Sequence, residues 1–105
     1  MNFHASISQA MQELQNKTGE PYTVLMQDGN MKLGYYAPVI TDPQAPHAQD
    51  EIYVIASGGG SFFRNGERVS FKTGDVLFVP SGMEHRFENF TDDFATWVVF
   101  YGDTH

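Results

Sequence analysis

Beyond Pro21 the sequence consists of short apolar runs separated by closely spaced turn residues, and this pattern restricts the fold more than any other feature. The runs that we interpret as strands are residues 22–27, 31–37, 51–57, 61–64, 67–71, 76–80, 85–90 and 94–101. Asn65-Gly66, between two of these runs, is typical of a two-residue β-hairpin turn. About eight short strands at such intervals predict an all-β sandwich or barrel rather than alternating strands and helices.

Two connections between these runs carry strong local signals. Residues 38–50 contain three prolines, so we expect an irregular connection there rather than a strand. Gly58-Gly59-Gly60 is interpreted as a tight turn, because this glycine run is too short and badly placed for a phosphate-binding loop.

Only the N-terminal segment carries a helical pattern. Apolar residues recur there at steps of three and four, and Gly19 and Pro21 follow as stop signals. We therefore expect a short amphipathic helix over about residues 3–17 and a barrel over about residues 22–102. A chain of 105 residues is long enough for a single domain with one core and too short for two.

The last predicted strand, residues 94–101, is apolar on both faces. A strand in the wall of a barrel with one solvated side should alternate between apolar and polar residues, so we expect its second face to be covered as well. The cover is either the N-terminal helix or another subunit, and we favour a homodimer.

Charge and cysteine content exclude several classes of function. The chain has no cysteine, which excludes disulfides, thiolate nucleophiles, zinc fingers and iron–sulfur clusters. Six Lys and Arg against thirteen Asp and Glu give a formal net charge of −7, which argues against nucleic-acid and anionic-membrane partners. No apolar run approaches the ~20 residues of a membrane helix, and the N-terminus lacks the pattern of a secretion signal. We therefore expect a cytoplasmic protein.

Two of the four histidines, His47 and His85, are internal, whereas His4 and His105 lie at the chain ends, where we expect no ligand role. His47 and Glu51 are four residues apart, and alternate side chains of an extended chain share a face. A carboxylate that points into a core needs a strong partner, because an unpaired buried charge is costly. A bound cation is one such partner.

The second internal histidine lies in a comparable setting. A strand ends at Pro80, the chain turns through Gly82, and His85 begins the next run. His85 and Phe87 share one face, and Phe87 marks that face as interior. We therefore expect His85 to point inward as well.

These two stretches resemble the two motifs of the cupin family, in particular small single-domain cupins of the type-2 conserved barrel kind. The first keeps the spacing H-x3-E-x6-G as His47, Glu51 and Gly58. The second matches G-x5-P-x-G-x2-H-x3-N as Gly74, Pro80, Gly82, His85 and Asn89. Over about residues 45–89, the resemblance implies a double-stranded β-helix, or jelly-roll barrel, with a metal inside it. His47, Glu51 and His85 are then the metal ligands, and the glycines, Pro80 and Asn89 shape turns.

One departure from the family pattern affects the site. The first motif of the family usually begins H-x-H, whereas this sequence has Ala45-Pro46-His47. Alanine cannot coordinate, so the resemblance implies three protein ligands, a set associated with the facial triad of ferrous enzymes that also suits Mn, Ni, Co or Zn. Gln49 is two residues from both His47 and Glu51, so in an extended chain its side chain lies on the same face, and it is a candidate extra ligand. Gln44 is a weaker candidate, and water is the remaining choice.

A divalent metal ion held by one carboxylate favours a small chelating anion as substrate. The leading hypothesis is a metal-dependent small-molecule enzyme, specifically a dioxygenase, with isomerase and decarboxylase activities less favoured. The alternative is a non-catalytic binding or sensing cupin, because the interior offers no independent acid or base. A degenerate site, in which Glu51 and the two histidines hydrogen-bond one another, is the structural alternative. Tyr35, Tyr53, Phe78 and Phe87 are expected in the pocket wall.

Overall fold

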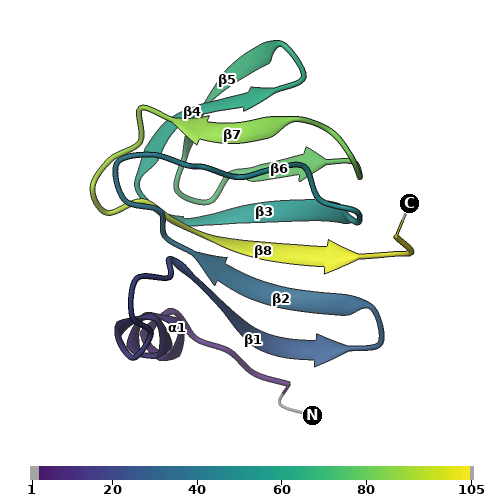
Figure 1. Cartoon of the computed structure of the whole chain (residues 1–105). Coiled ribbons are helices and arrows are strands. Elements are labelled where there is room, and N and C mark those ends of the chain that lie inside the picture. Colours follow the sequence, from purple (N-terminus) through teal and green to yellow (C-terminus); the bar gives the residue numbers. More distant parts are fainter. Residues whose placement is uncertain (1–2, 105) are drawn as a thin grey trace.

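The computed structural model describes residues 3–104, and within them the chain forms one helix and eight strands (Figure 1). The elements are α1 (Ile7–Gln15), β1 (Tyr22–Asp28), β2 (Met31–Tyr36), β3 (Asp50–Ser57), β4 (Gly59–Arg64), β5 (Glu67–Lys72), β6 (Val76–Val79), β7 (His85–Glu88) and β8 (Ala95–Tyr101). Every predicted strand is present, with its ends shifted by at most two residues. Within the described range, no helix is long and apolar enough to cross a membrane.

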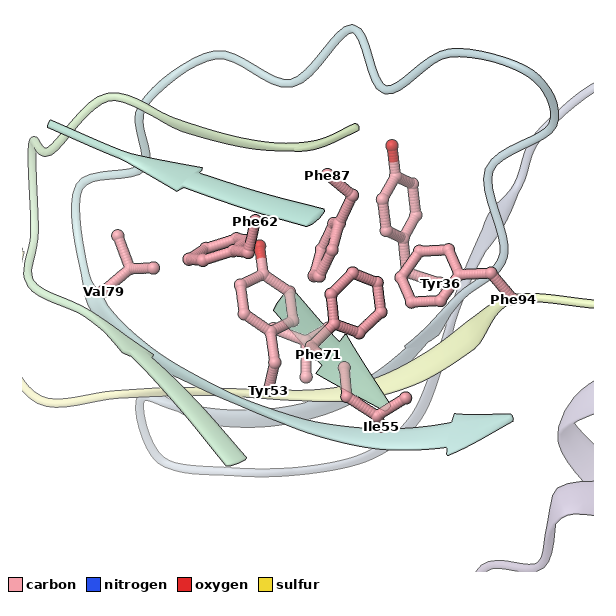
Figure 2. Close-up of a cluster of buried hydrophobic side chains, with 9 residues drawn as sticks. Tyr36, Tyr53, Ile55, Phe62, Phe71, Val79, Phe87 and Phe94 are labelled. Carbon is pink, nitrogen blue, oxygen red and sulfur yellow. The ribbon is translucent and has the colours of Figure 1, made fainter. Parts of the chain in front are cut away.

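The strands form two antiparallel sheets that face each other (Figure 1). The larger sheet has the order β1-β2-β8-β3-β6 and the smaller one β5-β4-β7. The interior between them is filled mainly by aromatic side chains from both sheets (Figure 2). Phe87 lies at the centre of this cluster, with ring centroids 4.7 Å from Phe94, 4.9 Å from Tyr53 and 5.4 Å from Phe71. The expectation of an all-β barrel is therefore confirmed.

Helix α1 packs on the outer face of the larger sheet. The Ser6 side chain caps its N-terminus by accepting a hydrogen bond from the backbone N–H of Gln9 at 3.1 Å. Ala10 is fully buried in a second cluster with Leu25, Tyr35 and Ala95, and Trp97 packs against that cluster. The helix is thus one cover of the outer face of β8. The prediction that Tyr35 lines the pocket is wrong, because Tyr35 is on the helix side of β2 and its neighbour Tyr36 points inward.

The glycine run at 58–60 does more than form a turn. Gly58 has a positive φ of 77° and makes the turn as expected, but Gly59 and Gly60 already belong to β4. A Cβ at Gly60 would lie 2.8 Å from the Cα of Phe90. These glycines therefore also allow neighbouring backbone segments to approach closely.

Candidate metal centre

The two motif segments are joined at one end of the barrel by hydrogen bonds from backbone N–H groups. The N–H of Gly82, in the turn before β7, donates to the carbonyl of His47 at 2.7 Å. The N–H of Ser81 donates to the Asp50 carboxylate at 2.8 Å. The turn that delivers His85 is thus fixed against the segment that carries His47 and leads into β3.

This arrangement brings together the three residues singled out from the sequence. Ligand atoms of His47, Glu51 and His85 all lie within 4.8 Å of one another. Nε2 of His85 is 3.2 Å from Oε1 of Glu51, and Nε2 of His47 is 3.8 Å from Oε2 of the same carboxylate. The Glu51 and His85 side chains are fully buried, whereas the His47 side chain is 37% exposed. The centre therefore has a sealed side and an accessible side.

Within the described chain, three buried polar atoms of this centre make no hydrogen bond: both carboxylate oxygens of Glu51 and Nε2 of His85. The Nδ1–H of His85 donates to the carbonyl of Met83 at 2.9 Å, so Nε2 is the nitrogen without a proton whenever the ring is neutral. The 3.2 Å contact with Glu51 lacks hydrogen-bond geometry, so the degenerate, mutually hydrogen-bonded site is not observed. A lone pair and a carboxylate facing each other in a buried site call for a positive charge between them, which a bound cation or a proton on His85 supplies.

The sequence of residues 35–101 matches a known family described as Cupin domain. The chain belongs to the cupin family. The chain is also 37% identical over 81 residues to an uncharacterized protein of Streptomyces coelicolor, a match that covers 75% of this chain and 77% of the relative. A shorter match, 51% identical over 39 residues, is to an oxalate-binding protein of Thermotoga maritima and covers 37% of this chain and 32% of that protein.

Solved structures agree on the fold of this cupin. A Cupin 2 conserved barrel domain protein from Salinispora arenicola superposes with a TM-score of 0.64 and 25% identity, over 77% of this chain and 74% of that one. KdgF from a Halomonas species superposes with a TM-score of 0.69 at 16% identity, over 80% of this chain and 83% of that one, which is evidence for the fold alone. The expected cupin barrel with a short N-terminal helix is confirmed.

The residues of the centre fit a divalent metal ion. Two imidazoles and a carboxylate suit Fe, Mn, Ni, Co or Zn. With metal–ligand bonds of about 2.1 Å, neighbouring ligand atoms of one ion lie about 3 Å apart, close to the 3.2 Å between His85 and Glu51. The hydrogen bond from Nδ1 of His85 to a carbonyl is the outer contact that usually orients a metal-binding histidine. The Glu51 carboxylate and Nε2 of His85 are thus placed and oriented as two ligands of one cation would be.

The candidate extra ligand Gln49 is directed away from the centre, so that prediction is wrong. Its side-chain amide donates to the carbonyls of Asn30 at 2.6 Å and Gly102 at 2.9 Å, at the outer edge of the barrel. The parity argument failed because β3 begins only at Asp50, and Gln49 is not part of an extended strand. Gln44, the weaker candidate, does lie at the centre, with Oε1 at 3.1 Å from Nε2 of His47.

A cavity of about 150 Å³, which we call the aromatic pocket, opens beside His47. Its walls are Tyr22, Tyr36, Gln44, His47, Tyr53, Val98 and Phe100. Sequence reasoning included Tyr53 but missed Tyr22, Tyr36 and Phe100. The signal for Tyr22 was Gly34 on the paired strand: a Cβ at Gly34 would lie 2.3 Å from the Tyr22 ring, so the missing side chain makes room for that ring.

Two further predicted wall residues lie elsewhere. Phe78 is 45% exposed and shares the outer face of the sheet with Ile52, its register partner on β3, so its assignment to the pocket wall is wrong. Its neighbour Val79, which pairs with Glu51, points inward instead. Phe87 is buried and packs against Tyr53, below the aromatic pocket rather than in its wall.

The other two histidines are at the ends of the chain. His4 is exposed in the N-terminal segment, and His105 lies outside the described residues.

The charge of the centre acts on its aromatic neighbours. Burial, together with the nearby Glu51 carboxylate, raises the pKa of Tyr53 well above its usual value and also raises that of Tyr22. Both phenols are therefore hydrogen-bond donors at neutral pH. Burial lowers the pKa of His85, but the Glu51 carboxylate and the Met83 carbonyl outweigh this effect and the pKa is raised overall.

Proposed function

We propose that this cupin binds one divalent metal ion through His47, Glu51 and His85 and acts as a small-molecule metalloenzyme, specifically a mononuclear non-heme dioxygenase. The observation that carries the proposal is the set of three buried polar atoms without hydrogen-bond partners, contributed by Glu51 and His85. A bound divalent ion would compensate these atoms and supply Lewis acidity and open coordination positions. Iron is the metal that the dioxygenase proposal requires, and Mn, Ni, Co and Zn are the other candidates.

The proposed substrate is a small chelating anion. One carboxylate against a divalent ion leaves a net positive charge, which favours an anionic ligand with two donor atoms. The aromatic pocket, at about 150 Å³, limits the ligand to a small molecule. The partial relative named an oxalate-binding protein supports this ligand class, because oxalate is a small chelating dianion.

The chain's own residues have defined tasks in this proposal. His47, on the accessible side, borders the aromatic pocket, so a ligand would enter past its ring. Tyr22 and Tyr53 line the same pocket and stay protonated. The hydroxyl of Tyr22 can donate a hydrogen bond to an anion, whereas that of Tyr53 already donates to Oε1 of Gln44. Phe100 packs edge-on against the His47 ring, with 5.1 Å between the ring centroids, and so helps to hold the orientation of the imidazole.

The alternative proposal is a non-catalytic binding or sensing cupin. Among the described residues, the lining of the aromatic pocket contains no carboxylate and no imidazole besides His47, so the phenols of its tyrosines are the acidic groups there that are independent of the metal ligands. The oxalate-binding protein of Thermotoga maritima, with which the chain shares 39 aligned residues, favours the same alternative. Turnover is the property that separates the two proposals.

Metal analysis of protein purified without oxygen tests the metal site. We expect about one ion per chain in the wild type, and its loss in His47→Ala and His85→Ala. Folding of each variant is checked by circular dichroism. Wild-type protein that takes up no divalent metal, even after reconstitution, would contradict both the metal site and the enzyme.

Oxygen uptake then tests the dioxygenase. The iron-loaded protein is mixed with diketones, catechols, thiols and small dicarboxylates, and uptake that disappears in His85→Ala would support the enzyme. A dicarboxylate that binds, by calorimetry, with no uptake or product would favour the binding protein.

The remaining predictions concern partners and location. We propose a homodimer that uses the outer face of β3 and β6, where the apolar side chains of Val54, Val76 and Phe78 are 36%, 63% and 45% exposed. Light scattering after gel filtration should give the mass of two chains, and Phe78→Asp should give that of one. A monomeric wild type would refute this. Cytoplasmic location and the absence of nucleic-acid partners stay predictions.

A further inference from the structure

The loop between β2 and β3 contains a buried aspartate that no catalytic proposal above uses. Asp42 is 8% exposed and accepts four hydrogen bonds. The donors are the hydroxyl of Tyr36 at 2.5 Å, the backbone N–H of Gln44 at 3.2 Å, the side-chain Nε2 of Gln44 at 2.8 Å and the backbone N–H of Phe87 at 2.8 Å. Asp42 therefore fixes the loop to both sheets and holds the side chain of Gln44.

These contacts determine which end of the Gln44 amide faces the metal centre. A carboxylate only accepts hydrogen bonds, so the group that contacts Asp42 must be the amide NH2. The carbonyl Oε1 then points the other way, 3.1 Å from Nε2 of His47 and 3.0 Å from the hydroxyl of Tyr53. Asp42 thus presents an oxygen donor to the centre.

The Gln44 carbonyl has the capacity and the position to coordinate. It has two lone pairs, and the Tyr53 hydroxyl occupies one of them. If Nε2 of His47 holds a metal ion, it carries no proton, and the second lone pair of Gln44 no longer receives a hydrogen bond from it. The 3.1 Å between the two atoms is close to the separation of about 3 Å between neighbouring ligands of one ion.

We propose that Oε1 of Gln44 is a fourth protein ligand of the metal and takes the place left by Ala45, with Asp42 as its positioning residue. This inference rests on the metal site proposed above. An amide oxygen is neutral, as an imidazole is, so the exchange leaves the charge of the site unchanged. It replaces a nitrogen donor by a harder oxygen donor, which shifts preference toward ions such as Mn²⁺ and Fe²⁺.

The test compares Gln44→Ala with Gln49→Ala. Gln49 is a matched control, because it lies five residues away in the same connection but binds two backbone carbonyls at the outer edge. Affinity for Mn²⁺ and Co²⁺ is measured by competition with a chromophoric chelator, and the coordination of Co²⁺ is read from its visible absorption spectrum. We expect Gln44→Ala to bind roughly 10–100-fold more weakly with an altered spectrum, and Gln49→Ala to match the wild type.

Asp42→Asn tests the positioning role. It keeps the size of the side chain and one acceptor, but its NH2 would oppose the amide NH2 of Gln44. We expect the Co²⁺ spectrum to change in the same direction as in Gln44→Ala. An unchanged spectrum in folded Asp42→Asn would contradict the positioning role.

The outcomes separate this inference from the proposed function. Wild-type protein that binds neither metal would overturn the metal site itself. Wild-type binding that is lost in Glu51→Ala but unchanged in Gln44→Ala would overturn the fourth ligand alone. Weaker binding in Gln44→Ala with an unaltered spectrum would also overturn it, because Gln44 would then only steady the His47 ring.

Discussion

The two ends of the barrel interior are equally buried but chemically opposite, and β3 connects them. Glu51, Tyr53 and Ile55 point inward from this strand and are 0%, 1% and 2% exposed. Around Ile55 the neighbours are apolar, and Phe71, Phe87 and Phe94 pack ring against ring. Around Glu51 the neighbours are imidazoles, and buried polar atoms lack partners. We call these regions the apolar end and the polar end.

The difference indicates that the apolar end stabilises the fold and the polar end costs stability in the metal-free protein. Aromatic packing removes apolar surface from water and adds favourable edge-to-face contacts. An unpaired buried carboxylate has lost its hydration without a replacement. Substitutions at the two ends should therefore change stability in opposite directions.

The largest effect is expected at the apolar end. Phe94→Ala removes a ring whose centroid is 4.7 Å from that of Phe87 and 5.2 Å from that of Phe71, and should lower the free energy of unfolding by about 3–5 kcal/mol. Urea unfolding measures it. Phe3→Ala is the control, because Phe3 is 87% exposed, and it should change stability by less than about 0.5 kcal/mol. Similar small effects of both substitutions on the free energy of unfolding would contradict the claim that the apolar end stabilises the fold.

At the polar end the sign should reverse. Glu51→Gln in metal-free protein should raise the free energy of unfolding by about 1–3 kcal/mol, because it removes a buried charge and supplies an NH2 group that can donate to Nε2 of His85. Glu67→Gln, on the exposed face of β5, is the control and should be nearly neutral. Destabilisation by Glu51→Gln would mean that the carboxylate already has a partner without metal.

A smaller effect is expected beside the polar end, where Gly34 makes room for Tyr22. Gly34→Ala should cost roughly 1–2 kcal/mol, because the new methyl group would overlap the Tyr22 ring. The cost should largely disappear in a Tyr22→Ala background, which a double-mutant cycle measures. An equal cost in both backgrounds would show that Gly34 acts through the strand and not through the aromatic pocket.

The sequence allowed the barrel and the three central residues to be predicted for simple physical reasons. Turn residues mark the strand ends, and strand parity places Glu51 with Tyr53 and His85 with Phe87 on inward faces. Alternation along a strand could not identify the inward face where both faces of the strand are apolar. The run Val76–Val79 gives no sign of which residues point inward, so Phe78 was assigned to the wrong side. Tyr35 and Tyr36 present the same ambiguity on β2.

The loop residues could not be predicted in the same way. Gln44 and Gln49 belong to an irregular connection that has no period, and their positions depend on distant partners. Asp42 binds the backbone of Phe87, 45 residues further along the chain, and Gln49 binds the carbonyl of Gly102. Such contacts are tertiary, and neither composition nor spacing indicates them.

The central claim, that the polar end is a metal site, is tested most directly by the unfolding temperature with and without metal. Chelator-treated wild type and Glu51→Gln are each heated alone and with Mn²⁺, Co²⁺ or Zn²⁺. A metal at a hundred times its Kd adds about 2.7 kcal/mol, which raises Tm by about 10 °C or more in a chain of this size. We predict this rise in wild type and none in Glu51→Gln, whose metal-free Tm is the higher of the two. An unfolding temperature of wild type that no divalent metal changes would contradict the claim.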